Sequence, residues 1–124
     1  MKYKILISII LIFLFSGCSG LGQIESISNL SISNLKNMNK IQLLKDAENI
    51  KYDSFGKIKG LSCKGSANSG SASKDGAMTQ LKIKAIKLNA NAILYTTCSH
   101  DASVDWSNNC WESWVCFGEA IKLK

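Results

Sequence analysis

Five cysteines constrain the fold of this chain more than any other feature. They are Cys18, Cys63, Cys98, Cys110 and Cys116, in a sequence of 124 residues. A chain of this length forms one domain with a small core, and disulfides are a common source of stability for such domains. Because five is an odd number, the cysteines cannot all pair within the chain, and one of them needs another role.

The N-terminal segment has the layout of a secretory signal peptide over residues 1–17. Two lysines in the first four residues are followed by the apolar run 5–15, and Ser16 and Gly17 then supply the small residues of a cleavage site. The run is too short to cross a bilayer as a helix, which takes about 20 apolar residues. We therefore expect export of the chain and cleavage before Cys18.

The segment Phe15-Ser16-Gly17-Cys18 resembles the lipobox of bacterial lipoproteins. In such proteins the cysteine carries fatty acid such as palmitate, and each buried CH₂ group contributes about 0.8 kcal/mol to membrane binding. Phe15 departs from the pattern, which usually has Leu at that position. The resemblance implies a lipid on Cys18, and the Ser that follows it is typical of sorting to the outer membrane. An ordinary secretory signal, which would leave Cys18 as a free thiol, is the alternative.

The other four cysteines form an even set in an oxidising compartment, which favours two disulfides. Three pairings are possible, and spacing alone does not select one of them. The alternative is a zinc site that includes His100, but no Cys-x-x-Cys pair is present, and the closest pair is Cys110 and Cys116. We predict two disulfides without a metal, and we predict that His100 lies in an exposed loop.

Charge and composition limit the class of partner. Without the first 17 of its 124 residues the chain keeps 107, with 13 lysines against 9 acidic residues and a net charge of +4. It contains no arginine, so bidentate recognition of phosphates or bases is absent, which argues against nucleic acid as a partner. An apolar content of 46% excludes a wholly disordered chain.

The mature chain divides into a tether and a domain. Residues 18–39 are rich in Ser, Asn and Gly and show no sustained helical or strand period. We predict a lipid-anchored flexible tether over 18–39, extended or weakly ordered, and a folded domain over 40–124.

The patterns within the domain predict three strands and one main helix. Strands are expected at 55–63, at 92–98 as a buried central strand, and at 111–122 with both faces at least partly covered. The helix is expected at 74–89, where apolar residues recur at helical spacing. Those residues are Met78, Leu81, Ala85 and Leu88. This order predicts an α+β fold, a small two-layer domain in which the helix packs on a short mixed sheet.

The helix prediction rests on length and propensity, because the periodicity is mixed. Ser73 is a plausible N-cap with Asp75 in the first turn, whereas Ile83 and Ile86 lie off the main apolar stripe. The abundance of Ala, Leu, Lys and Met decides for a helix.

No set of residues in the chain indicates catalysis. The single histidine has no nucleophile motif near it, and the glycines lack the ending of a phosphate loop. The nearest acidic pair, Asp101 and Asp105, is typical of a solvated loop. We predict that the protein is not an enzyme and has no cofactor.

Several segments resemble the RcsF family of outer-membrane lipoproteins. Residues 87–94, KLNANAIL, resemble the helix-to-strand junction of that family, and residues 115–120, VCFGEA, resemble its terminal strand. The four domain cysteines follow in the same order. The resemblance covers about residues 50–122 and the lipobox, and it implies the disulfides Cys63–Cys110 and Cys98–Cys116.

The resemblance also implies a function and partners. A member of this family would sense envelope stress with its periplasmic domain and signal to the Rcs phosphorelay by protein–protein contact with an inner-membrane regulator that resembles IgaA. The barrel-assembly machinery and outer-membrane β-barrel proteins would be further partners. Trp106, in the polar loop 99–109, is our candidate contact residue, because aromatic side chains are enriched in interface hot spots. We expect Trp111 and Trp114 to pack against the disulfides and the helix.

One departure from the family favours a second hypothesis. The tether of the family is typically long, Pro-rich and basic, whereas this one has about 20 residues and no Pro. A flexible chain of that length has an r.m.s. span of roughly 25 Å. The alternative function is that of a structural or assembly-related envelope lipoprotein with no signalling role.

Overall fold

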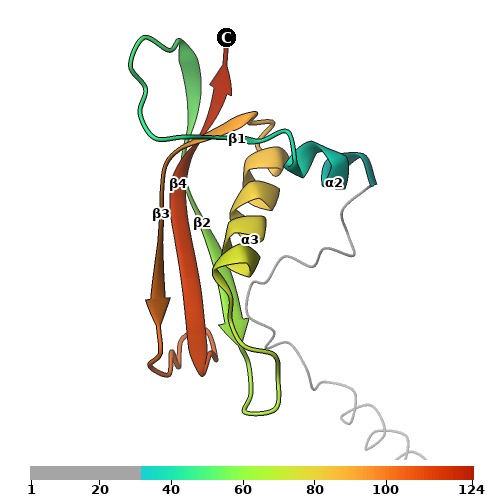
Figure 1. The fold of residues 1–124 in the computed structure, drawn as a ribbon, viewed down its shortest axis with the longest axis vertical. Coiled ribbons are helices and arrows are strands. Elements are labelled where there is room, and N and C mark those ends of the chain that lie inside the picture. The colour runs from blue at the N-terminus through green and yellow to red at the C-terminus, as the bar shows by residue number, and fades with distance from the viewer. Residues whose placement is uncertain (1–31) are drawn as a thin grey trace, which may run out of the picture.

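Two antiparallel strands, β3 (Ala92–Asp101) and β4 (Glu112–Leu123), form the centre of a mixed sheet in the computed structural model, which describes residues 32–124 (Figure 1). The long strand β2 (Tyr52–Lys64) pairs antiparallel with the other side of β4. The short strand β1 (Gln42–Leu44) pairs parallel with the start of β3. The strand order is therefore β1-β3-β4-β2.

The helix α3 (Lys74–Lys87) connects β2 to β3 and packs on one face of the sheet, chiefly against β2 and β4 (Figure 1). Because both β2 and β3 run antiparallel to β4, they run parallel to each other with β4 between them. The connection is thus a split β-α-β unit, closed by the β3–β4 hairpin.

The hydrophobic core lies between α3 and the sheet, with a smaller cluster on the opposite face. The main cluster contains Ile41, Ile58, Ala77, Leu81, Ala85, Ala90, Ile93, Cys116 and Ala120. The smaller cluster contains Ala92, Leu94 and Ile121, with Leu44, Ala47, Tyr52 and Leu123 packed against it. The segment between β1 and β2 therefore covers only one end of the face that α3 leaves open.

A glycine on β2 allows the close approach of α3. A Cβ atom at Gly60 would collide with the carbonyl oxygen of Ala77 and would lie 2.5 Å from the backbone nitrogen of Leu81. Both obstacles are helix backbone, which cannot rotate away as a side chain can. Gly60 therefore sets the distance between the two layers.

Both disulfides have the pairing that the family resemblance implied. Cys98 and Cys116 are directly opposite each other on β3 and β4, with Cα atoms 4.1 Å apart. Cys63, at the end of β2, bonds to Cys110 just before β4, with Cα atoms 5.4 Å apart. One bridge thus joins neighbouring strands, and the other ties the hairpin loop to β2.

The predicted fold class is confirmed, and its main helix begins where predicted. The N-cap is Ser73, whose side chain accepts a hydrogen bond from the backbone N–H of Gly76, and α3 ends at Lys87, two residues before the expected end. Ile83, which lies off the expected stripe, is fully buried, whereas Leu88 on that stripe is 39% exposed. The stripe therefore predicted only part of the buried helix face.

The structure corrects two local predictions. Residues Ile32–Met38, within the predicted extended tether, form the short helix α2, which contacts α3. His100 lies in strand β3 and not in a loop, although its side chain is exposed as expected. Both faces of β4 are partly covered, as predicted, since on the face opposite α3 Ile121 is fully buried whereas Phe117 is 45% exposed. The predicted signal peptide 1–17 and Cys18 lie outside the described residues.

Candidate interaction surface

The loop that joins β3 to β4 is held in shape by Asp105 and Cys110. Their backbones exchange two hydrogen bonds, of 2.7 and 2.9 Å, and Cys110 is also bonded to Cys63. The Asp105 carboxylate accepts hydrogen bonds from the backbone N–H of Ser107 at 2.9 Å and from the side-chain amide of Asn108 at 2.6 Å. Trp106, between these anchors, is 85% exposed. The loop therefore presents a large aromatic side chain from a constrained backbone.

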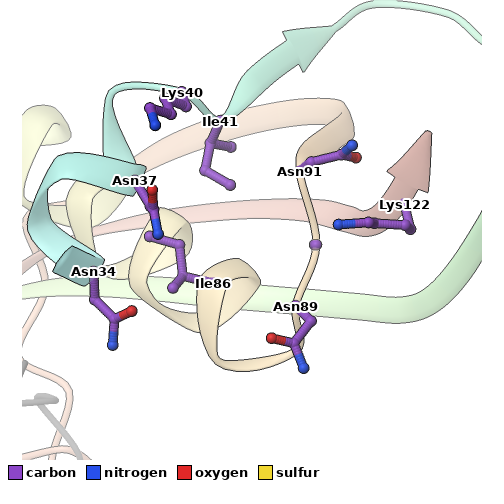
Figure 2. Close-up of a pocket in the computed structure, with 9 residues that line it drawn as sticks. Asn34, Asn37, Lys40, Ile41, Ile86, Asn89, Asn91 and Lys122 are labelled. Atoms are coloured by element: carbon purple, nitrogen blue, oxygen red, sulfur yellow. The ribbon is translucent and has the colours of Figure 1, made fainter. Parts of the chain in front are cut away.

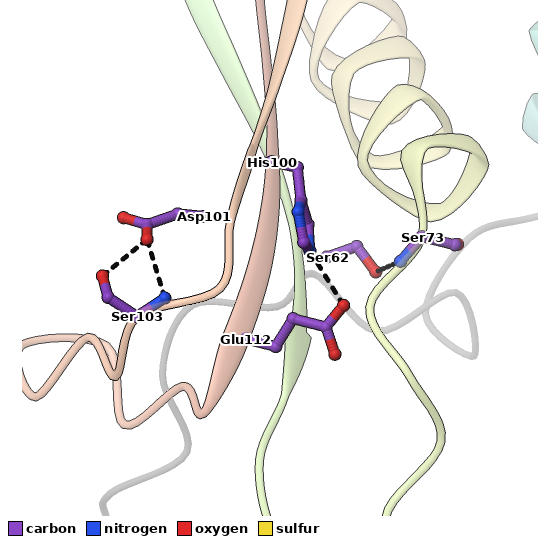
Figure 3. A network of polar contacts seen from close by, with 6 residues as sticks. All are labelled: Ser62, Ser73, His100, Asp101, Ser103 and Glu112. Atoms are coloured by element: carbon purple, nitrogen blue, oxygen red, sulfur yellow. Dashed lines mark hydrogen bonds and ion pairs between the residues drawn. The ribbon is translucent and has the colours of Figure 1, made fainter.

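Side-chain hydrogen bonds to Asp105 and Asp101 favour the ionised form of both carboxylates. Donation by the side chain of Ser107, and next by that of Asn108, lowers the pKa of Asp105 from 3.8 to about 2. The side chain of Ser103 donates to Asp101 at 2.5 Å and lowers the pKa of that carboxyl from 3.8 as well (Figure 3). Hydrogen bonds to the charged form favour ionisation.

His100 and Glu112 join the two strands at the base of this loop. The Nε2 atom of His100 lies 2.9 Å from a carboxylate oxygen of Glu112, and the two side chains meet across the hairpin (Figure 3). The His100 ring is tilted against the ring of Trp114, with centroids 5.1 Å apart. Trp114 is half-buried and packs against the main core cluster, as expected, but Trp111 is 54% exposed, which corrects its expected packing.

On the same face of the sheet, next to Trp114, two serines connect β2 to the start of α3. The backbone N–H of Ser73 donates to the hydroxyl of Ser62 at 3.1 Å (Figure 3). Since Ser62 precedes Cys63, this bond places the disulfide-bearing end of β2 next to the N-terminus of α3.

The sheet face opposite α3 is an exposed surface that the sequence reasoning missed. We call it the open face. Its exposed residues on the three longer strands include Lys57, Lys59, Tyr95, Thr97 and Phe117. A hollow of about 300 Å³ lies there between Tyr95 and Phe117, with Lys57 and Glu119 also in its lining.

A bulge in β3 explains why Tyr95 is exposed, although the sequence predicted a buried strand here. The register shifts between Leu94 and Thr97, and Tyr95 has a φ of 55° in the left-handed region. Its side chain is 55% exposed in consequence. The apolar run from Ala92 onward gives no signal of this change, because Tyr and Thr are ordinary strand residues.

A polar recess of about 310 Å³ lies where α2 meets the end of α3 (Figure 2). Its lining is dominated by amide and ammonium groups, without a carboxylate. The polar residues of the lining are Asn34, Asn37, Asn89, Asn91, Lys40 and Lys122. The Asn91 side-chain oxygen accepts a hydrogen bond from the backbone of Leu123 at 2.8 Å. This amide therefore joins the α3–β3 turn to the end of β4.

Within residues 32–124, no group of three or more His, Cys, Asp or Glu residues is arranged to hold a metal ion. None of the helices in this range is long and apolar enough to span a bilayer. The polar clusters that the structure does contain shape loops and strand ends.

Comparison with known families identifies the chain. The RcsF lipoprotein family matches residues 24–124, which is most of the sequence. The chain belongs to the RcsF lipoprotein family. Membership indicates a membrane-associated lipoprotein of the Rcs pathway, a family of signalling proteins and not of known enzymes.

Other comparisons add little to this RcsF assignment. The search of curated proteins finds no match. Among solved structures, a protein of unknown function from Pediococcus pentosaceus, of the DUF74 family, has 18% identity and a TM-score of 0.47. The alignment covers 68% of this chain and 98% of that one.

Some of the site residues predicted from sequence are described by the structure, and others remain untested. The matched range begins at residue 24, so it includes α2 as well as the disulfide-bonded domain. The structure brings together Cys63 and Cys110, and it places Trp106 in the loop that this bond restrains. The lipidation prediction at Cys18 and the contact role of Trp106 remain predictions.

Proposed function

We propose that this chain is an outer-membrane lipoprotein that senses envelope stress with its periplasmic domain and signals to the Rcs phosphorelay by protein–protein contact. The family match over residues 24–124 carries the proposal. An IgaA-like inner-membrane regulator is the proposed recipient of the signal. Outer-membrane β-barrel proteins and the barrel-assembly machinery are proposed to hold the protein in the unstressed state.

The proposed mechanism is a change of partner without catalysis. The exposed Trp106 side chain projects from a loop that the Asp105 hydrogen bonds and the Cys63–Cys110 bond restrain. Because the loop backbone is already restrained, little backbone entropy is lost when Trp106 binds, which suits it to a contact that must form when stress exposes the domain.

The anchor is proposed to be fatty acid on Cys18, with residues 1–17 removed. Two lysines, an apolar run and small residues before the cysteine support this processing. Mass spectrometry of the membrane-extracted protein should detect an acylated N-terminal cysteine. A free Cys18 thiol in that material would rule the anchor out.

Deletion and complementation in the native host test the signalling role. Deleting the gene should abolish induction of a reporter under Rcs control when the outer membrane is damaged, and the wild-type gene should restore it. A Cys18→Ala variant that is secreted at the same level should fail to restore normal regulation. Unchanged induction in the deletion strain would contradict the signalling role.

A structural or assembly-related envelope role is the second candidate, and one observation favours it. Because α2 begins at Ile32 and packs against α3, only the 13 residues 19–31 separate Cys18 from the packed part of the chain. Even fully extended, this segment spans at most about 45 Å. If the deletion strain keeps its stress response but has a leaky outer membrane, this second role is supported.

A further inference from the structure

The outer edge of β2 has no strand paired with it in the described part of the chain. β2 is the last strand in the order β1-β3-β4-β2, and its element contacts are with β4 and α3 only. It is 13 residues long, and its register with β4 is regular from Gly56 to Lys64. In an antiparallel ladder, alternate residues direct their backbone N–H and C=O groups away from the paired strand. A long row of these groups therefore faces outward.

This edge carries an excess of positive charge on the open face. Lys57 and Lys59 are both exposed, and neither has an ion-pair partner among residues 32–124. One of the nearby carboxylates is engaged elsewhere. Asp53 pairs with Lys124 at 2.8 Å. Glu119, opposite Lys57, hydrogen-bonds to the neutral hydroxyl of Ser54 and keeps its negative charge, so the two lysines face one carboxylate across the strand pair.

The spacing of these lysines predicts which side chains a complementary neighbouring strand would place opposite them. Lys57, Lys59 and the partly buried Leu61 follow one another at every second position, so their side chains share the open face. A strand added beyond β2 would place its own side chains about 4.5–5.5 Å from theirs, measured between Cβ atoms. Two acidic residues and one apolar residue at alternate positions would match this pattern.

We propose that the outer edge of β2 binds an extended, acidic segment of a protein partner by strand addition. Backbone hydrogen bonds to the edge supply affinity, and the pairing of partner carboxylates with Lys57 and Lys59 selects the segment. This inference rests on the proposed function, because it names the chemistry of a partner for the signalling domain. It concerns a surface distinct from the loop that carries Trp106.

Lysines on an edge strand have a second known effect, because they discourage pairing with another copy of the same chain. The two effects predict different results. If the lysines only prevent self-association, their neutralisation should produce oligomers, and no acidic segment should bind this edge in the wild-type protein. If they recognise a partner strand, their neutralisation should weaken binding of an acidic segment.

Selection from a random ten-residue peptide display library against the oxidised domain provides the probe. We expect enrichment of peptides with acidic residues at alternate positions next to an apolar one. The selected peptide should protect amide protons of β2 from hydrogen exchange. No enrichment, or protection confined to other elements, would overturn the proposal.

Backbone methylation of the selected peptide tests strand pairing directly. N-methylation of alternate residues blocks one edge of an extended peptide, and methylation of the remaining residues blocks the other edge. One of the two methylated peptides should lose binding by at least about tenfold, and the other should retain it. Equal effects of both would indicate side-chain docking and contradict strand addition.

Charge variants test the role of the two lysines. Lys57→Glu/Lys59→Glu should weaken binding of the acidic peptide by at least about tenfold and should favour a lysine-substituted peptide. The matched control, Lys36→Glu/Lys40→Glu, makes the same change in net charge on and beside α2, away from this edge. Equal weakening by both pairs would reduce the effect to net charge and overturn the proposal.

Failure of this inference can be separated from failure of the proposed function. If the acidic peptide binds the β2 edge but the deletion strain keeps its Rcs response, the surface stands and the signalling role does not. If the deletion abolishes the response but Lys57→Glu/Lys59→Glu signals normally and no peptide is selected, the signalling role stands and the β2 surface does not.

Discussion

Trp106 is nearly as exposed as a side chain in a folded protein can be, with 85% of its surface accessible. Its replacement by Ala should therefore leave the free energy of unfolding within about 0.5 kcal/mol of the wild type. If Trp106 is a partner contact, the same variant should lose most of the Rcs reporter signal. The two measurements are a thermal melt of the purified domain and the reporter assay in complemented cells.

Trp114 provides the control for this prediction. It packs against the main core cluster and the His100 ring, so Trp114→Ala should destabilise the domain by about 2 kcal/mol or more. A comparable loss of stability in Trp106→Ala would make Trp106 a structural residue. Normal signalling by a stable Trp106→Ala variant would remove it from the interface.

The titration of Asp105 tests the hydrogen bonds that shape the loop. Its pKa is lowered to about 2, below its ordinary value of 3.8, because Ser107 and Asn108 donate to the ionised carboxylate. The contribution of these bonds to loop order is therefore present above pH 4 and is lost as the pH falls through about 2. Ser107→Ala should raise the pKa of Asp105 toward 3.8 in an NMR titration of the carboxyl carbons.

Ser103→Ala is the matched variant for this titration, since Ser103 donates to Asp101 instead. It should raise the pKa of Asp101 and change that of Asp105 much less. If Ser107→Ala leaves the Asp105 midpoint where it was, the hydrogen bonds described for the loop do not hold that carboxylate.

Gly60 is the position where one added carbon should matter most. A Cβ there meets the backbone of Ala77 and Leu81, so Gly60→Ala should lower the free energy of unfolding by about 1–3 kcal/mol. Gly70→Ala is the control, because nothing lies within 4 Å of its Cβ position, and the variant should be unchanged or slightly more stable. Denaturant unfolding with both disulfides intact measures the difference. Equal stability of the two variants would contradict the close approach of α3.

At the scale of elements, the N-cap of α3 carries a prediction that the sequence already suggested. The Ser73 side chain accepts a hydrogen bond of 3.0 Å from Gly76, so Ser73→Ala should cost about 1 kcal/mol of stability. Ser73→Gly should cost only a few tenths of that amount, since glycine is itself an acceptable cap. Ser71→Ala, at an exposed position two residues earlier, should have no measurable effect. Denaturation midpoints rank the three variants.

How far each element could be predicted depended on whether its signal was local. The α3 helix has a cap, a suitable composition and an apolar stripe, and it starts at Lys74, where its start was expected at about residue 74. The α2 helix has the sequence ISNLKNM, whose Asn and Ser residues are poor helix formers, and none of its residues is buried. Its contact with α3 comes from tertiary structure, which no seven-residue pattern contains.

The C-terminal end of β3 and the open face could not be predicted either, because both depend on tertiary contacts that a local sequence pattern does not contain. The polar residues after Cys98 were assigned to a loop, yet pairing with β4 continues to Asp101, because the disulfide and the His100–Glu112 contact hold the strands together beyond the core. Alternation in β4 was visible in the sequence, but it does not say how much of each face is exposed to solvent. Trp111 was expected to pack against the disulfides and the helix but is 54% exposed, because the alternation does not reveal which positions are covered.

At the scale of the whole molecule, the sheet formed within residues 32–124 is covered on one side by one main helix, and its role in stability must be compatible with the proposed role in recognition. The face against α3 holds the main cluster, while the open face leaves Phe117 and Tyr95 in contact with solvent. A domain of this size gains little from burial alone, so covalent links compensate for the part of the open face that stays uncovered. The two disulfides therefore allow the exposed surfaces on which the proposed partners depend.

Removing the disulfides one at a time tests how much each contributes to stability and to signalling. The Cys63–Cys110 bond closes 47 residues and the Cys98–Cys116 bond closes 18, so chain entropy predicts losses of about 4 and about 3 kcal/mol for the paired Cys→Ala variants. Cys98–Cys116 lies between strands that are already paired, whereas Cys63–Cys110 is the covalent tie between the Trp106 loop and β2, beside the 2.7 Å hydrogen bond from the Trp111 N–H to the Lys64 carbonyl. Unfolding in denaturant should rank the variants in that order.

At a temperature where both stay folded, the variant without Cys63–Cys110 should lose more Rcs signal. Stronger impairment of signalling by loss of Cys98–Cys116 would show that strand register, and not the restrained loop, is what the regulator reads.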